Sequence, residues 1–124
     1  MGGGEAVIVA GIGCRKDCAA EDIVAAVRRA EAALGVRAEA LAAPDFKRNE
    51  PGLRQAAEAL GLTLRFAARA ALEAAQAACP TRSDAAEAAT GLGSVAEAAA
   101  LAEGGTLLAP RLAEGGATCA LARL

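Results

Sequence analysis

The sequence contains no histidine. A serine or cysteine nucleophile activated by an imidazole is therefore excluded in its usual form. The same absence removes histidine as a metal ligand, including a histidine beneath a cobalt or haem iron. It also removes the side chain best suited to moving protons near neutral pH.

Aromatic residues, excess positive charge and long apolar runs are also missing. Phe46 and Phe66 are the only aromatic residues, and 13 Lys and Arg against 15 Asp and Glu give a formal charge of −2. Stacking platforms and a basic excess are typical of nucleic-acid-binding domains, so we expect no nucleic-acid partner. No charge-free stretch, Ala6–Cys14 included, approaches the roughly 18 residues of a membrane span. Met1–Glu5 does not resemble a secretory signal, so we expect a cytoplasmic protein with reduced thiols and no membrane partner.

Hydrophobic residues nevertheless make up 55% of the 124 residues, and more than half of them are alanine. A chain of this length is predicted to form a single domain, residues 1–124, with a core of its own. Because few large apolar side chains are available, the elements must pack closely through small residues.

Alternating strands and helices are predicted along the chain. Strands are expected at Ala6–Ala10, Val36–Ala42 and Leu62–Phe66, with Gly11–Asp17 and Ala43–Asn49 as loops. Helices are expected at Ala19–Leu34, Pro51–Leu60, Ala67–Ala78, Ser83–Thr90 and Ser94–Glu103. Predicted caps are Asp17, Ser83 and a capping box of Ser94 with Glu97, and Gly35 and Gly61 end two helices.

The last segment predicts a hairpin, with strands at Thr106–Pro110 and Ala117–Leu124 and a turn around Glu114–Gly116. Strand–helix alternation followed by a hairpin indicates an α/β fold. Its sheet is expected to be mostly parallel with one antiparallel pair and helices on both faces.

Two basic loops are expected at one edge of this sheet. Parallel strands end at the same edge, where ligands of open α/β sheets bind, and Arg15-Lys16 and Lys47-Arg48 follow the first two strands. Such pairs are ordinarily solvated surface, but two converging basic loops suit a polycarboxylate or phosphate ligand. The helix starts at Ser83 and Ser94 offer further backbone donors.

Other motifs in the sequence carry weaker signals. Gly11-x-Gly13 lacks the third glycine of a dinucleotide fingerprint, because Lys16 stands there. The spacing of Cys14 and Cys18 does not match a thioredoxin-like motif, and the four cysteines do not predict a zinc site. Cys14, beside Arg15 and Lys16, is either a reactive thiolate or a small residue in a tight turn.

Five short motifs, in order and spanning most of the chain, resemble the cobalamin-biosynthesis CobE/CbiG C-terminal domain family. They are Gly11–Arg15, Pro44–Lys47 with Glu50 and Gly52-Leu53, Thr81–Ser83, Gly91 with Ser94–Leu101, and Thr118–Ala122. Two positions depart from the family pattern. Cys18-Ala19 stands where a small hydroxyl residue is frequent, and Arg111 replaces a lysine before the hairpin turn.

The resemblance implies a three-layer α/β/α domain with a mixed, mostly parallel sheet of about five strands and a C-terminal hairpin. It also implies a corrinoid-binding or carrier role, since free-standing members are associated with the aerobic route to vitamin B12. In the anaerobic route, the domain is similar to the C-terminal part of a longer protein. That longer protein opens the lactone of cobalt-precorrin-5A and releases acetaldehyde. Together with the basic loops and helix starts, these motifs give the predicted substrate-binding residues, which are Gly13, Cys14, Arg15, Asp45, Lys47, Glu50, Ser83, Ser94 and Glu97.

Three hypotheses follow. The first is a non-catalytic module that binds or delivers a precorrin or hydrogenobyrinic acid, with no cofactor and no metal of its own. The second is a precorrin-5A lactone hydrolase, with Cys14 as nucleophile or Asp45 or Glu50 as general base. The third is a docking module for corrin-pathway enzymes.

Overall fold

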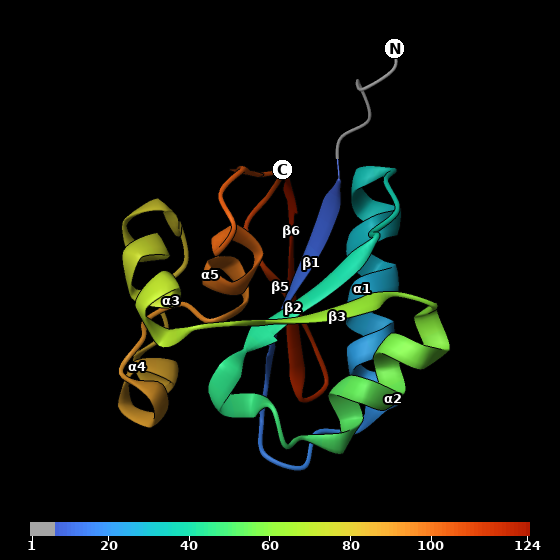
Figure 1. Cartoon of the computed structure of the whole chain (residues 1–124), viewed down its shortest axis with the longest axis horizontal. Helices are drawn as coiled ribbons and strands as arrows, with labels where there is room; N and C mark the ends of the chain where they lie inside the picture. The colour runs from blue at the N-terminus through green and yellow to red at the C-terminus, as the bar shows by residue number, and fades with distance from the viewer. Residues whose placement is uncertain (1–6) are drawn as a thin grey trace.

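A six-stranded sheet lies between two layers of helices in the computed structural model, which describes residues 7–124 (Figure 1). The strands are β1 (Ile8–Cys14), β2 (Ala40–Pro44), β3 (Thr63–Ala67), β4 (Thr106–Leu107), β5 (Leu112–Glu114) and β6 (Ala117–Arg123). The helices are α1 (Ala20–Leu34), α2 (Pro51–Leu60), α3 (Arg69–Ala75), α4 (Asp84–Thr90) and α5 (Ala96–Leu101), with 3₁₀ turns η2 (Asp45–Lys47) and η3 (Gln76–Ala78). None of these helices is long and apolar enough to cross a bilayer.

The sheet order is β3-β2-β1-β6-β4, and β5 also pairs with β6. Strands β1, β2 and β3 are parallel, whereas β6 runs antiparallel to β1, β4 and β5. The α/β fold class, the mixed sheet and the C-terminal hairpin are confirmed. The expectation of a mostly parallel sheet with one antiparallel pair is wrong: two strand pairs are parallel and three are antiparallel, because β6 pairs with β1 and β4 as well as with β5. The sequence did not predict the pairing of β6 with β1, which brings the hairpin beside the end of β1.

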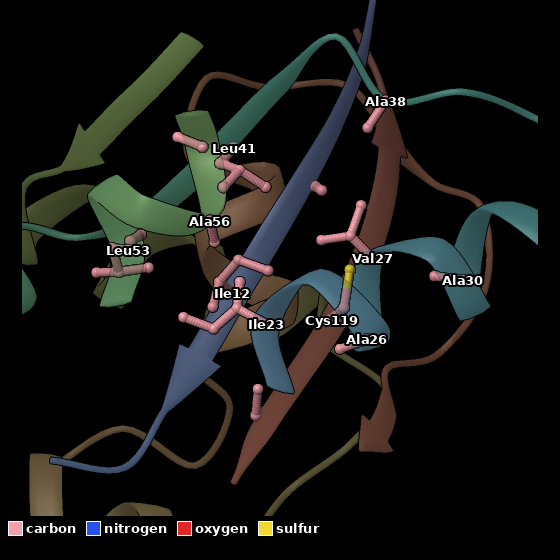
Figure 2. Packing of buried hydrophobic residues seen from close by; sticks show 14 of the residues in the cluster. Ile12, Ile23, Ala26, Val27, Ala30, Ala38, Leu41, Leu53, Ala56 and Cys119 are labelled. Carbon is pink, nitrogen blue, oxygen red and sulfur yellow. The ribbon is translucent and has the colours of Figure 1, made fainter. Parts of the chain in front are cut away.

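The sheet face under α1 and α2 carries the larger aliphatic side chains. Ile12 of β1 and Leu41 of β2 lie among Ile23 and Val27 of α1 and Leu53 of α2 (Figure 2), and all five are fully buried. This layer is the main core of the domain.

Under α5, the opposite face of the sheet consists mainly of glycine and alanine. The buried alanines of α5 lie against Gly11 of β1 and against Ala120 and Ala122 of β6. A Cβ atom on Gly11 would stand 2.1 Å from the carbonyl oxygen of Ala96 and 2.4 Å from the backbone nitrogen of Ala100. The close packing that the alanine content predicts is therefore confirmed at α5.

Three strand predictions differ from the structure. The hairpin strand expected at Thr106–Pro110 is wrong, because β4 covers only Thr106–Leu107 and the strand that turns into β6 is β5. The first strand was expected to end before Gly11, but β1 continues to Cys14 because β6 pairs with it along its whole length. The second strand begins at Ala40 instead of Val36, because the preceding Ala38 N–H is bound by the carboxylate of Glu31, 2.7 Å away.

The helix ends are mostly as predicted. Gly35 and Gly61 end α1 and α2 in left-handed conformation, and the Ser83 hydroxyl caps α4 by accepting from the Ala86 N–H at 3.1 Å. The prediction that Asp17 caps α1 is wrong. Asp17 has φ +60°, and its backbone N–H donates to Glu50 Oε1 at 2.9 Å.

Candidate functional site

A pocket of about 640 Å³ opens at the carboxyl end of β1. The turn after β1, the η2 turn, the inner side of α4, the segment before α5 and the β5–β6 hairpin line it. These segments meet toward the lower end of the molecule in Figure 1. The pocket therefore lies outside the carboxyl ends of the parallel strands β1 and β2, where ligands of open α/β sheets commonly bind.

Four cationic side chains line this pocket, and no Asp or Glu belongs to its lining within residues 7–124. The four are Arg15, Lys16, Lys47 and Arg111. None of them forms an ion pair with another described residue. Unpaired cations that share one hollow attract an anionic ligand, even in a chain whose net charge is −2.

Small residues make up much of the pocket wall. Gly13, Gly93, Gly115, Gly116, Ala85, Ala86, Ala89, Ala113 and Ala117 belong to the lining. Helix α4 supplies three of these alanines and contains no buried residue. Phe46 adds one aromatic ring, which is 44% exposed. The pocket wall therefore combines cationic side chains with small and apolar ones.

Behind the pocket lies the carboxylate of Glu97, whose residue is 0% exposed. Its Oε1 accepts from the Thr81 N–H and the Ser94 hydroxyl, both at 3.0 Å. Its Oε2 accepts from the Thr81 hydroxyl at 2.8 Å and the Arg111 N–H at 2.9 Å. One carboxylate thus joins three loops, two of which contribute Ser94 and Arg111 to the pocket wall.

Hydrogen bonding keeps this buried carboxylate ionised. Burial raises the pKa of Glu97, but the Arg111 N–H, the Thr81 hydroxyl and N–H, and the Ser94 hydroxyl together lower it below the usual value. The prediction of a capping box is wrong. The N-cap of α5 is Val95, and the Ser94 hydroxyl donates to the Glu97 carboxylate instead of accepting a backbone N–H of the helix. The Ser94 N–H donates instead to Gln76 Oε1 at 3.1 Å.

The model of the family described as "Cobalamin synthesis G C-terminus" matches residues 8–122, almost the whole chain. The chain belongs to this family. Its involvement in cobalamin biosynthesis is supported by this membership and by two solved structures.

Both structures are similar to the chain over nearly their full length. The crystal structure of CobE, described as a protein from the cobalamin (vitamin B12) biosynthetic pathway, is 40% identical. The match covers 96% of this chain and 91% of the CobE chain, with a TM-score of 0.89. The crystal structure of cobalamin biosynthesis protein chiG from Agrobacterium tumefaciens is 46% identical, with a TM-score of 0.74. This match covers 94% of this chain and 97% of the chiG chain. Comparison with curated proteins finds no match.

Six of the nine predicted site residues lie in the lining of this one pocket. Gly13, Cys14, Arg15, Lys47, Ser83 and Ser94 line it, whereas Asp45, Glu50 and Glu97 do not. Asp45 pairs with Arg48, whose guanidinium lies 4.5 Å from the centre of the Phe66 ring, so Arg48 is not among the lining residues. Glu50 accepts the Asp17 N–H.

Arg111 and the alanine face of α4 are site features that sequence reasoning missed. The replacement of a family lysine by Arg111 was the one available signal. Within residues 7–124, no three His, Cys, Asp or Glu side chains cluster as metal ligands would.

Cys14, the candidate thiolate, lies at the last position of β1 and not at a helix start, where a thiolate would be stabilised. Burial raises the pKa of its thiol to about 11, and nearby Lys47 only partly opposes this effect. The environment favours the neutral thiol, which is a poor nucleophile.

We expect Cys14 to be alkylated slowly in the folded protein. At about pH 8, the thiolate fraction of an ordinary thiol is on the order of 100-fold larger than that of Cys14 in the folded chain. Iodoacetamide should therefore react correspondingly more slowly with Cys14 than with an ordinary thiol. Mass spectrometry of the Cys14 peptide after timed labelling, with urea-unfolded chain as control, measures the ratio. Equal rates in both states would restore Cys14 as a candidate nucleophile.

Proposed function

We propose that the pocket binds or delivers an anionic corrinoid intermediate, a precorrin or hydrogenobyrinic acid, through the carboxylates around its ring. The observation that supports this most directly is the set of four unpaired cations, Arg15, Lys16, Lys47 and Arg111, in a lining without a carboxylate. Precorrins are flat macrocycles fringed with carboxylates. Cations at several points of the rim suit such a fringe, and the walls of small residues leave room for the ring.

The lactone-hydrolase alternative has less support. Its nucleophile candidate, Cys14, is held neutral by burial. Its base candidates, Asp45 and Glu50, are bound to Arg48 and to the Asp17 N–H and do not line the pocket. A binding or delivery role requires none of these three side chains to react.

Combined replacement of Arg15 and Lys47 by alanine is expected to weaken hydrogenobyrinic acid binding about 100-fold. Each charge-assisted contact contributes about 1.5 kcal/mol, or about tenfold in affinity. Titration followed by absorbance gives the dissociation constants, and added salt should weaken binding by the wild-type chain.

The matched control is the double variant Arg28→Ala/Arg37→Ala. It makes the same change in net charge at two exposed positions outside the pocket. We expect its affinity to stay close to that of the wild-type chain. An equal loss in both double variants would mean that overall charge, not this pocket, governs binding. Absence of any spectral change with micromolar wild-type protein would contradict the proposed function.

A further inference from the structure

Burying the ionised carboxylate of Glu97 costs solvation free energy, and a structural role alone does not account for that cost. Glu97 lies in the first turn of α5, yet none of the four hydrogen bonds that it accepts caps this helix. Its donors lie 14 and 16 residues away along the chain at Arg111 and Thr81, and three away at Ser94. What these donors share is their place beside the pocket.

Each donor segment controls a different part of the wall. Arg111 is the cation contributed from the hairpin side, and its backbone N–H is held by Glu97 Oε2 at 2.9 Å. Ser94 lines the pocket just before α5. Thr81 stands two residues before Ser83, which lines the pocket and caps α4.

We infer that Glu97 is a positioning residue for ligand recognition, which fixes the backbone of Arg111 so that its guanidinium meets the ligand opposite the loops of Arg15 and Lys47. This inference rests on the proposed function. It adds a residue that has no contact with the ligand and that holds one of the four recognition cations, Arg111, in place. A ligand with carboxylates on several sides is then recognised better than one with a single acidic edge.

The test is a set of double-variant comparisons with hydrogenobyrinic acid as the probe. Glu97→Ala, which removes both acceptor oxygens, and Arg111→Ala are each expected to weaken binding about tenfold. Because Glu97 acts through Arg111, the variant with both changes should bind about as weakly as Arg111→Ala alone. Combined with Lys47→Ala, which lies on another segment, Glu97→Ala should instead multiply the loss.

A spectroscopic readout separates positioning from general loss of structure. In ligand-free protein, the NMR signal of the Arg111 amide should shift and exchange faster in Glu97→Ala, while amides of α1 and α2 stay unchanged. Thr81→Val, which removes one donor and leaves the carboxylate, is a milder second variant expected to weaken binding about threefold. Glu103→Ala, at an exposed carboxylate outside the pocket, is the matched control and should bind as wild type.

The outcomes distinguish the two proposals. Losses that multiply in the Arg111→Ala background, or an unchanged Arg111 amide, would overturn the positioning role while the proposed function stands. Failure of the wild-type chain to bind the probe would overturn the proposed function and, with it, the role of Glu97 in recognition.

Discussion

Replacing Gly11 by alanine is expected to lower the free energy of unfolding by about 3 to 5 kcal/mol, a large part of the stability of a domain this size. The new Cβ would stand 2.1 Å from Ala96 O, 2.4 Å from Ala100 N and 2.8 Å from Ala100 Cβ. Two of these atoms belong to the backbone of α5, so no side-chain rotation relieves the overlap. The helix would have to move away from the sheet.

Thermal and urea unfolding measure this effect, with Gly61→Ala as the matched control. Gly61 has φ +69° and open space around its Cβ position, so alanine there is strained without a clash. We expect a cost of about 1 kcal/mol at Gly61. Equal losses in the two variants would contradict the close contact between α5 and β1.

Replacing Glu97 by glutamine is expected to cost about 3 kcal/mol. Each carboxylate oxygen accepts one backbone N–H, from Thr81 or from Arg111. Whichever oxygen becomes the amide NH₂, a backbone donor faces another donor and stays unsatisfied. The neighbouring hydroxyls can rotate to accept, but the N–H groups cannot. Urea unfolding near neutral pH gives the difference, and Glu103→Gln is the control.

The same variant predicts a pH dependence. The pKa of Glu97 is lowered in the folded chain, so its ionisation stabilises the fold above the unfolded-state pKa of about 4.3. This contribution is lost as the pH falls below that value toward the folded pKa. The stability gap between wild type and Glu97→Gln should therefore shrink in acid. A gap that stays constant from neutral pH to about pH 3 would refute this assignment.

Features that depend on neighbours in sequence could be predicted, and those that depend on distant partners could not. The Ser83 cap and the Gly35 helix end are local, and both were predicted correctly. Arg15 and Lys47 share a pocket because parallel strands end at one edge, a general rule of topology.

The capping box failed because nothing near Ser94 and Glu97 in the sequence reveals the distant donors at Thr81 and Arg111. The length of β1 was underestimated for a similar reason. Glycine ordinarily weakens a strand, but Gly11 and Gly13 are needed here where α5 and the Thr118 side chain come close. Arg111 reaches the pocket only because β6 pairs with β1.

The contact between α5 and β1 also bears on the entropy of binding. Main-chain atoms set the spacing between α5 and Gly11, and Gly13 lies near the backbone of Ala96 and the side chain of Val95. A spacing set by the backbone cannot relax through rotamer changes, so Ser94 and Val95 occupy fixed positions before any ligand arrives. This side of the pocket is preorganised, and a rigid ring that docks against it orders few protein groups that were free beforehand.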